Sequence, residues 1–82
     1  MDCYTPEFFQ EAILQKHPEA SYIRAQTSQD VSVLVAFLSG LFPEDDFSQV
    51  DEIVVFDSPN ASTQFFVVFT KGCMVMTFEV PK

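Results

Sequence analysis

The sequence predicts an α+β fold: two helices packed on one face of a three-stranded antiparallel meander, with residues 20–26 as a candidate short fourth strand. Apolar residues recur at helical spacing in the first half of the chain, whereas the second half holds apolar runs separated by turn residues. Helices followed by a meander pack most simply as a two-layer sandwich. The 82 residues suffice for one domain and not for two, so we expect residues 1–82 to form a single unit.

The first helix is expected over residues 6–16. Thr5 can cap its N-terminus, and Pro6 suits the first helical position. The apolar residues that follow recur at helical spacing: Phe9, Ala12 and Ile13. Pro18 ends the pattern, because the residue before a proline avoids the α region. Residues 20–26 fit either a short extended segment or a loose helical turn, and we favour the extended form.

The second helix is expected to start near Thr27 or Ser28, either of which can cap it, and to stop before Pro43. One face follows the i, i+3, i+4, i+7 rule through Val31, Leu34, Val35, Leu38, Leu41 and Phe42. The opposite face is also apolar, through Val33, Ala36 and Phe37. Such a helix is either buried on both sides or partly covered by another chain. Its β-branched valines make a strand the competing interpretation.

Three strands are expected at residues 53–56, 63–70 and 73–80. Lys71 and Gly72 separate the last two and have the spacing of a two-residue hairpin, which would place Thr70 opposite Cys73. That register would gather an apolar face directed at the helices, made of Phe65, Val67, Phe69, Met74, Met76 and Phe78. The outer face would be mixed, with Phe66, Val68 and Val75 among its apolar members.

The charge balance is strongly acidic, with twelve Asp and Glu against four Lys and Arg and a formal net charge of −8. Nucleic acids and anionic membrane surfaces repel such a chain, so we exclude direct binding to either. Basic partners would be attracted by electrostatic steering. The competing interpretation is that the charge only keeps a Phe-rich domain in solution.

No catalytic, cofactor or metal site is evident in the sequence. His17 is the only histidine, and its pairing with Cys3 or Cys73 as a nucleophile has no supporting pattern. One histidine and two distant cysteines do not make a zinc site, and the acidic stretch lacks the spacing of a calcium loop. Two glycines do not provide a phosphate cradle. We therefore expect a protein that is not an enzyme and needs no cofactor or metal.

Cysteine usage and the N-terminus favour the cytoplasm. Two cysteines are too few for a disulfide framework, and we expect both thiols to be reduced. The N-terminus lacks the charged and apolar regions of a signal peptide. The longest apolar run, residues 33–38, is far shorter than the roughly 20 residues that span a membrane.

The acidic stretch from Pro43 to Glu52 is the first candidate binding surface. It carries five acids and no base, with Phe47 and Val50 as expected inward anchors, and Asp57 follows shortly after it. Held rigidly, these acids could mimic spaced phosphates and occupy a basic groove on a partner protein: Glu44, Asp45, Asp46, Asp51, Glu52 and Asp57. The competing interpretation is a solvated loop.

The second candidate surface is apolar. It comprises Val33 and Phe37 on the second helix, or Phe66, Val68 and Val75 on the outer sheet face. Large exposed apolar patches usually mark an interface, so a homodimer is one expectation and burial within the monomer is the other.

Size, acidity and the lack of catalytic residues together resemble, as a class, phage or mobile-element inhibitors and bacterial immunity proteins. The resemblance covers gross properties and no motif. It implies an anti-defence or immunity-type inhibitor that blocks a nucleic-acid-handling enzyme through an acidic surface. The alternative function is a structural homo-oligomer or adaptor in which the charge serves only solubility.

Overall fold

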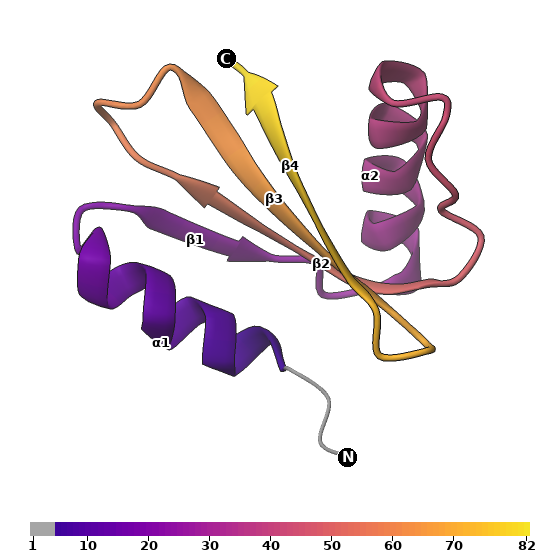
Figure 1. The fold of residues 1–82 in the computed structure, drawn as a ribbon, viewed down its shortest axis with the longest axis horizontal. Coiled ribbons are helices and arrows are strands. Elements are labelled where there is room, and N and C mark those ends of the chain that lie inside the picture. The colour runs from indigo at the N-terminus through magenta and orange to yellow at the C-terminus, as the bar shows by residue number, and fades with distance from the viewer. Residues whose placement is uncertain (1–4) are drawn as a thin grey trace.

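The computed structural model describes residues 5–82 of the chain. Their elements are α1 (Pro6–Lys16), β1 (Ser21–Arg24), α2 (Ser28–Leu41), β2 (Val50–Asp57), β3 (Thr63–Thr70) and β4 (Val75–Pro81). The strands form one antiparallel sheet in the order β1-β2-β3-β4 (Figure 1). The predicted α+β meander is confirmed, and the segment near residues 20–26 contains the fourth strand.

Both helices begin at the capping residues that the sequence offers. The hydroxyl oxygen of Thr5 accepts a hydrogen bond from the backbone amide of Phe8 at 3.2 Å. Thr27 and Asp30 form a reciprocal capping box: Oγ1 of Thr27 accepts from the Asp30 amide, and the Asp30 carboxylate accepts from the Thr27 amide. These bonds satisfy donors that a helix start leaves unpaired, and they fix where each helix begins.

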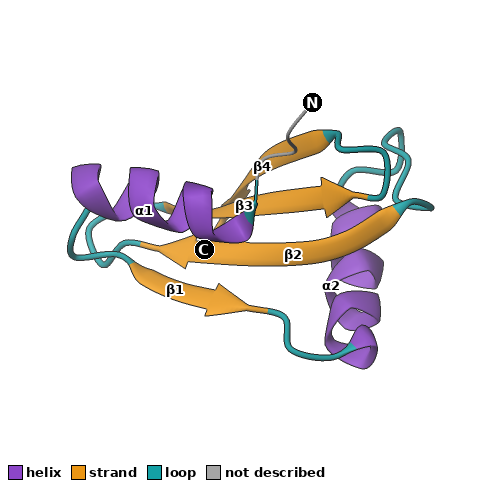
Figure 2. Ribbon diagram, turned by 90° about the horizontal axis from the view of Figure 1, so that it is seen from below, coloured by secondary structure: helices purple, strands orange, loops and turns teal. Residues whose placement is uncertain are grey.

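The sheet is covered on both faces, by a different helix on each. Leu38 of α2 belongs to a core cluster with Ile53 and Val68, whereas α1 packs on the opposite side. There the ring of Phe9 meets the ring of Phe69 edge to face, with the ring centroids 5.6 Å apart. Figure 2 shows the two helices on opposite sides of the sheet. The expected two-layer arrangement, with both helices on one face, is therefore corrected to one helix on each face.

The β3–β4 turn explains this difference. The expected two-residue hairpin requires a left-handed residue inside the turn, but Gly72 does not adopt a positive φ. Cys73 does so instead, with φ at 64°, and the Thr70 amide donates to the carbonyl of Met74 at 3.0 Å. The loop is thus one residue longer than expected, and Thr70 does not pair with Cys73.

One extra loop residue moves every side chain of β4 to the other face relative to β3. Phe78 lies opposite Phe66 and not Phe65, and Met76 lies opposite Val68. These side chains form the α2 side of the core, while Val67 and its neighbours form the α1 side. Both faces of the sheet are apolar and must be buried from water, so one helix packs on each face.

Candidate functional site

The acidic stretch forms an ordered loop between α2 and β2. Its inward anchor is Phe47, which is 9% exposed and packs on Phe78 with ring centroids 5.6 Å apart. The Asp46 carboxylate accepts a hydrogen bond from the Ser48 amide at 2.9 Å. The amide of Asp45 donates to the carbonyl that precedes the loop, at 3.2 Å. The loop therefore holds its acids in place through a buried ring and local hydrogen bonds.

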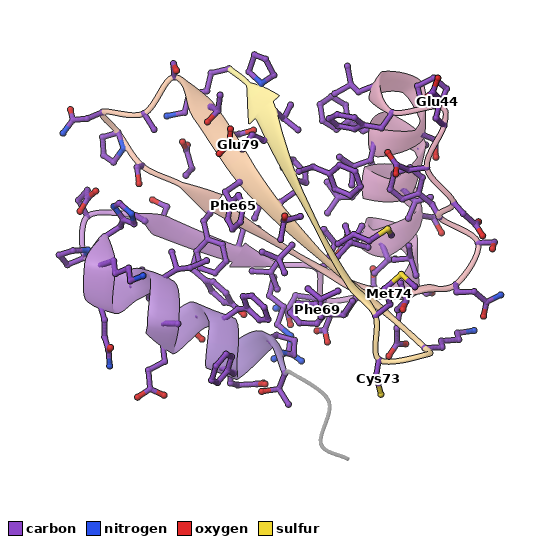
Figure 3. The ribbon with its side chains drawn as sticks, viewed as in Figure 1. Glu44, Phe65, Phe69, Cys73, Met74 and Glu79 are labelled. Carbon is purple, nitrogen blue, oxygen red and sulfur yellow. The ribbon has the colours of Figure 1, made fainter. Side chains whose placement is uncertain are left out.

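Three consecutive acids of this loop are exposed and carry no ion pair within the described residues: Glu44, Asp45 and Asp46. We call them the acid triad. Hydrogen bonds from the side chain and backbone of Ser48 lower the pKa of Asp46, which keeps that carboxyl ionised. Figure 3 shows Glu44 beside the C-terminal end of α2. α2 has no base in its last turn, so the negative end of the helix dipole adds to the negative potential here.

The other three predicted acids do not join the triad as one patch. Asp51 is exposed at the start of β2. The carboxylate of Glu52 accepts a hydrogen bond from Nε of Arg24, so its charge is compensated. Asp57 lies at the far end of β2, about 20 Å from Asp51 at the usual rise of a strand, and its Oδ1 is 2.6 Å from Nζ of Lys82.

The five apolar residues of the second candidate surface do not lie together in the structure either. Val33 lies on the outer side of α2 and is 63% exposed, whereas Phe37 lies at the edge of the helix next to the sheet: it is 47% exposed, and its ring centroid is 6.0 Å from that of Phe66. Phe66 and Val68 are buried beneath α2, because the register of β4 places them in the core. Val75 is half-buried on the other face, near α1. Only the α2 residues of this set therefore present an apolar surface to solvent.

Leu41 extends the exposed side of α2, which the sequence pattern did not indicate. It fits the inward i, i+3, i+4 pattern, yet it is 49% exposed. Phe42, the next residue, turns inward instead and packs on Phe78, with ring centroids 4.7 Å apart. The helix ends at this point, so the periodicity that would bury Leu41 no longer holds.

The structure does not support the hypothesis that His17 pairs with a cysteine to make a nucleophile. Cys73 is disulfide-bonded, so the expectation of a reduced thiol at this position is wrong; Cys3 lies outside the described residues. His17 caps the C-terminus of α1, with Nδ1 3.7 Å from Oε1 of Glu19. Cys73 shares a pocket wall with Thr5, at the other end of that helix, which is about 16 Å long.

A cleft of about 330 Å³, which no sequence pattern indicated, opens between the C-terminal end of α1 and the sheet. Phe56, Phe65 and Ile13 supply apolar walls, and Lys16 and Glu79 supply charges of opposite sign. Figure 3 shows Phe65 and Glu79 on the sheet, where they are partners on the neighbouring strands β3 and β4. The cleft lies on the face opposite α2, so it is separate from the acid triad.

Within residues 5–82, no three His, Cys, Asp or Glu side chains converge closely enough to hold a metal ion. Neither helix in this range has the length and apolar character needed to cross a membrane. Comparison with protein-family models, with curated proteins and with solved structures finds no match. Function is therefore argued from the surfaces of the chain itself.

Proposed function

We propose that this chain is a small protein-binding inhibitor whose acid triad occupies a basic, nucleic-acid-binding surface of a partner protein. The observation that supports it is the exposed, uncompensated triad Glu44, Asp45 and Asp46 on a loop that is anchored by Phe47. Pre-organised charges lose little conformational freedom on binding and raise association rates with oppositely charged surfaces. A nucleic-acid-binding groove presents such a surface, because it is built to receive phosphates.

We propose a smaller binding surface than the six acids that the sequence suggests. Glu52 and Asp57 each have a cationic partner, so we assign them to the fold and not to the binding surface. Asp51 is exposed at the start of β2, outside the loop that holds the triad. The anti-defence or immunity-type role remains a proposal that rests on the general resemblance of small acidic inhibitors. A cytoplasmic location also remains a prediction, and the disulfide at Cys73 weighs against a strongly reducing compartment.

The test compares two variants with the same change in net charge. In one, the triad is neutralised by Glu44→Gln, Asp45→Asn and Asp46→Asn. In the control, three acids elsewhere on the surface are neutralised by Glu11→Gln, Glu19→Gln and Glu79→Gln. Each protein is immobilised and used to capture partners from host lysate at low and high salt, with bound proteins identified by mass spectrometry.

We expect the wild-type and the control to capture a nucleic-acid-handling protein that is released as the salt concentration rises, and the triad variant to capture little of it. Thermal unfolding establishes that both variants are folded. If the triad variant captures the partner as well as the wild-type does, or if the partner is indifferent to salt, the proposal is wrong.

The alternative function, a homo-oligomer, is favoured by one observation: α2 exposes Val33, Phe37 and Leu41. Sedimentation at several protein concentrations distinguishes the two functions. A mass that rises with concentration and is not reduced by salt supports the homo-oligomer. A constant monomer mass leaves the inhibitor as the better account.

A further inference from the structure

The outer side of α2 carries an exposed apolar stripe. Its large members are spaced at i, i+4 and i+8, which places them in one line along the helix: Val33, Phe37 and Leu41. The inner side of the same helix, including Leu38, packs on the sheet. Ala36 and Gly40 lie between the large residues and are also exposed. The ring of Phe37 touches Phe66 of β3 on one side, with the ring centroids 6.0 Å apart, yet about half or more of each large stripe residue remains exposed to solvent.

The stripe lies in one of the two longest uncharged segments of the chain. Residues 31–43 contain no Asp, Glu, Lys or Arg, although the chain has sixteen such residues. Charged residues are usually depleted at the centre of protein interfaces, whereas an ordinary solvated helix face carries them. The composition of this face is that of an interface centre.

Gly40 fits the same interpretation. A glycine inside a helix lowers helix stability relative to alanine, and it is normally retained for a positive φ or for close packing. Gly40 has no positive φ, and a Cβ built on it would meet no atom within 4 Å. The described chain therefore gives no steric reason for a glycine here. A bare backbone at this point would let an external element approach α2 closely.

The charge next to the stripe indicates which occupant it fits. The stripe ends at Leu41, and Glu44 follows three residues later, within about 11 Å along the chain. An apolar strip that ends in three uncompensated acids is complementary to an element with apolar residues beside Lys or Arg. A second copy of this chain would bring another net charge of −8 and another acid triad to the same surface.

We infer that the outer face of α2 docks an amphipathic basic helix of the partner protein. The apolar residues of that helix, spaced at i, i+4 and i+7, cover Val33, Phe37 and Leu41, and its Lys or Arg residues meet the acid triad. This inference rests on the proposed function for the role of the triad and names the chemistry of the partner element. A helix fits the stripe because two helices pack along their ridges and grooves, most closely where one of them carries small residues.

The test uses synthetic helical peptides of about 18 residues, long enough to form a helix in water. One peptide has a leucine stripe with lysines at one end, a second has the same composition in scrambled order, and a third keeps the stripe but has Gln for Lys. Binding to the full chain is measured by fluorescence anisotropy at low and high salt. We expect the first peptide to bind at least about tenfold more tightly than either of the others.

Variants of the chain test the apolar stripe and the acid triad separately. Val33→Thr with Leu41→Gln removes apolar surface with little change in size, at two positions that are about half exposed or more. We expect it to weaken binding of the first peptide by about tenfold and to leave the salt dependence unchanged. Neutralising the triad should weaken binding and also flatten the salt dependence. Thermal unfolding checks that each variant is folded.

Three results would overturn the inference: tight binding of the scrambled basic peptide, unchanged affinity in the Val33→Thr, Leu41→Gln variant, or failure of every peptide to bind. Self-association of the wild-type chain that this variant abolishes would also overturn it, since a second copy would then cover the stripe. The proposed function fails separately, when neutralising the triad leaves partner capture from lysate intact.

Discussion

Arg24 of β1 reaches across to Glu7 of α1, with Nη1 of the guanidinium 2.6 Å from Oε1 of the carboxylate. Nε of the same guanidinium donates to Glu52 of β2, so one side chain joins α1 to two adjacent strands. Hydrogen bonds to Glu52 and Glu7 raise the pKa of Arg24, which stays charged. One of the four bases in the chain is thus used to hold α1 against the sheet.

Replacing Arg24 should loosen this attachment. The Arg24→Gln variant leaves Glu7 and Glu52 without a cation, and we expect it to lower the free energy of unfolding by about 1 kcal/mol. This value is modest because the Arg24 side chain is 35% exposed and water screens the pair. Arg24→Lys should recover only part of the loss, since an ammonium group cannot make the forked contact with both carboxylates. Urea unfolding measures both, and an unchanged Arg24→Gln midpoint would contradict the prediction.

The same contact should make stability depend on acid pH. The pKa of Glu7 is lowered by a hydrogen bond from its own backbone amide and next by the Arg24 guanidinium. As pH falls, the Glu7 carboxyl is therefore protonated first in the unfolded chain. Its contribution to the free energy of unfolding is complete above the unfolded pKa of about 4.3. It is lost as pH falls through the lower pKa of the folded state. In the Glu7→Gln variant, the free energy of unfolding should decrease less steeply as pH falls through this range. Glu11→Gln makes the same change in charge and should reduce this pH dependence less.

Phe47 should determine the order of the acidic loop. Its ring is buried against Phe78, and truncation to alanine removes that anchor. We expect Phe47→Ala to lower the free energy of unfolding by about 3 kcal/mol. Amide hydrogen exchange should also become faster at residues 44–50 than in the sheet. Equal exchange in wild-type and variant would mean that the loop is held by its hydrogen bonds alone.

Burial of both sheet faces can be tested at two adjacent residues. Val67 faces α1 and Val68 faces α2, and both are fully buried. Val67→Ala and Val68→Ala should therefore each lower the free energy of unfolding by about 2 kcal/mol, as expected for lost methyl groups and a small cavity. A sheet with one solvated face would show a large loss at only one of the two positions.

Gly40→Ala should stabilise the isolated chain. The added Cβ meets no atom within 4 Å, and the backbone does not adopt a positive φ. Removing conformational freedom from the unfolded state should raise the free energy of unfolding by about 0.5–1 kcal/mol. Thermal unfolding measures this gain, and a loss of stability would show that the helix needs glycine at this position for its own fold.

Much of the fold is local in origin, and the sequence was enough to predict it. The caps Thr5 and Thr27 and the stops Pro18 and Pro43 act within a few residues of their own positions. They predict α1 at residues 6–16 and the start of α2 near Thr27 or Ser28 without any knowledge of the sheet. The acidic loop and its Phe47 anchor were also predictable, because one aromatic residue stands in a run of polar ones.

Part of the candidate site could not be predicted. Glu52 looked like a free acid, but its partner Arg24 lies 28 residues away, and Asp57 is matched by Lys82 near the end of the chain. Such pairs depend on strand neighbours that the sequence pattern does not fix. The exposed Leu41 was missed for a related reason, since the helix ends before its periodic position can be buried.

The sequence by itself determined the elements, their order and the acidic character of the α2–β2 loop, because these follow from neighbouring residues. Only the tertiary structure decided which side chains share a face of the sheet. β3 is apolar on both sides, so alternation along the strand does not specify a register, and the left-handed Cys73 in the turn sets it instead. That one-residue difference placed Phe66 and Val68 under α2, gave each face its own helix, and left Val33 and Phe37 as the exposed part of the apolar set.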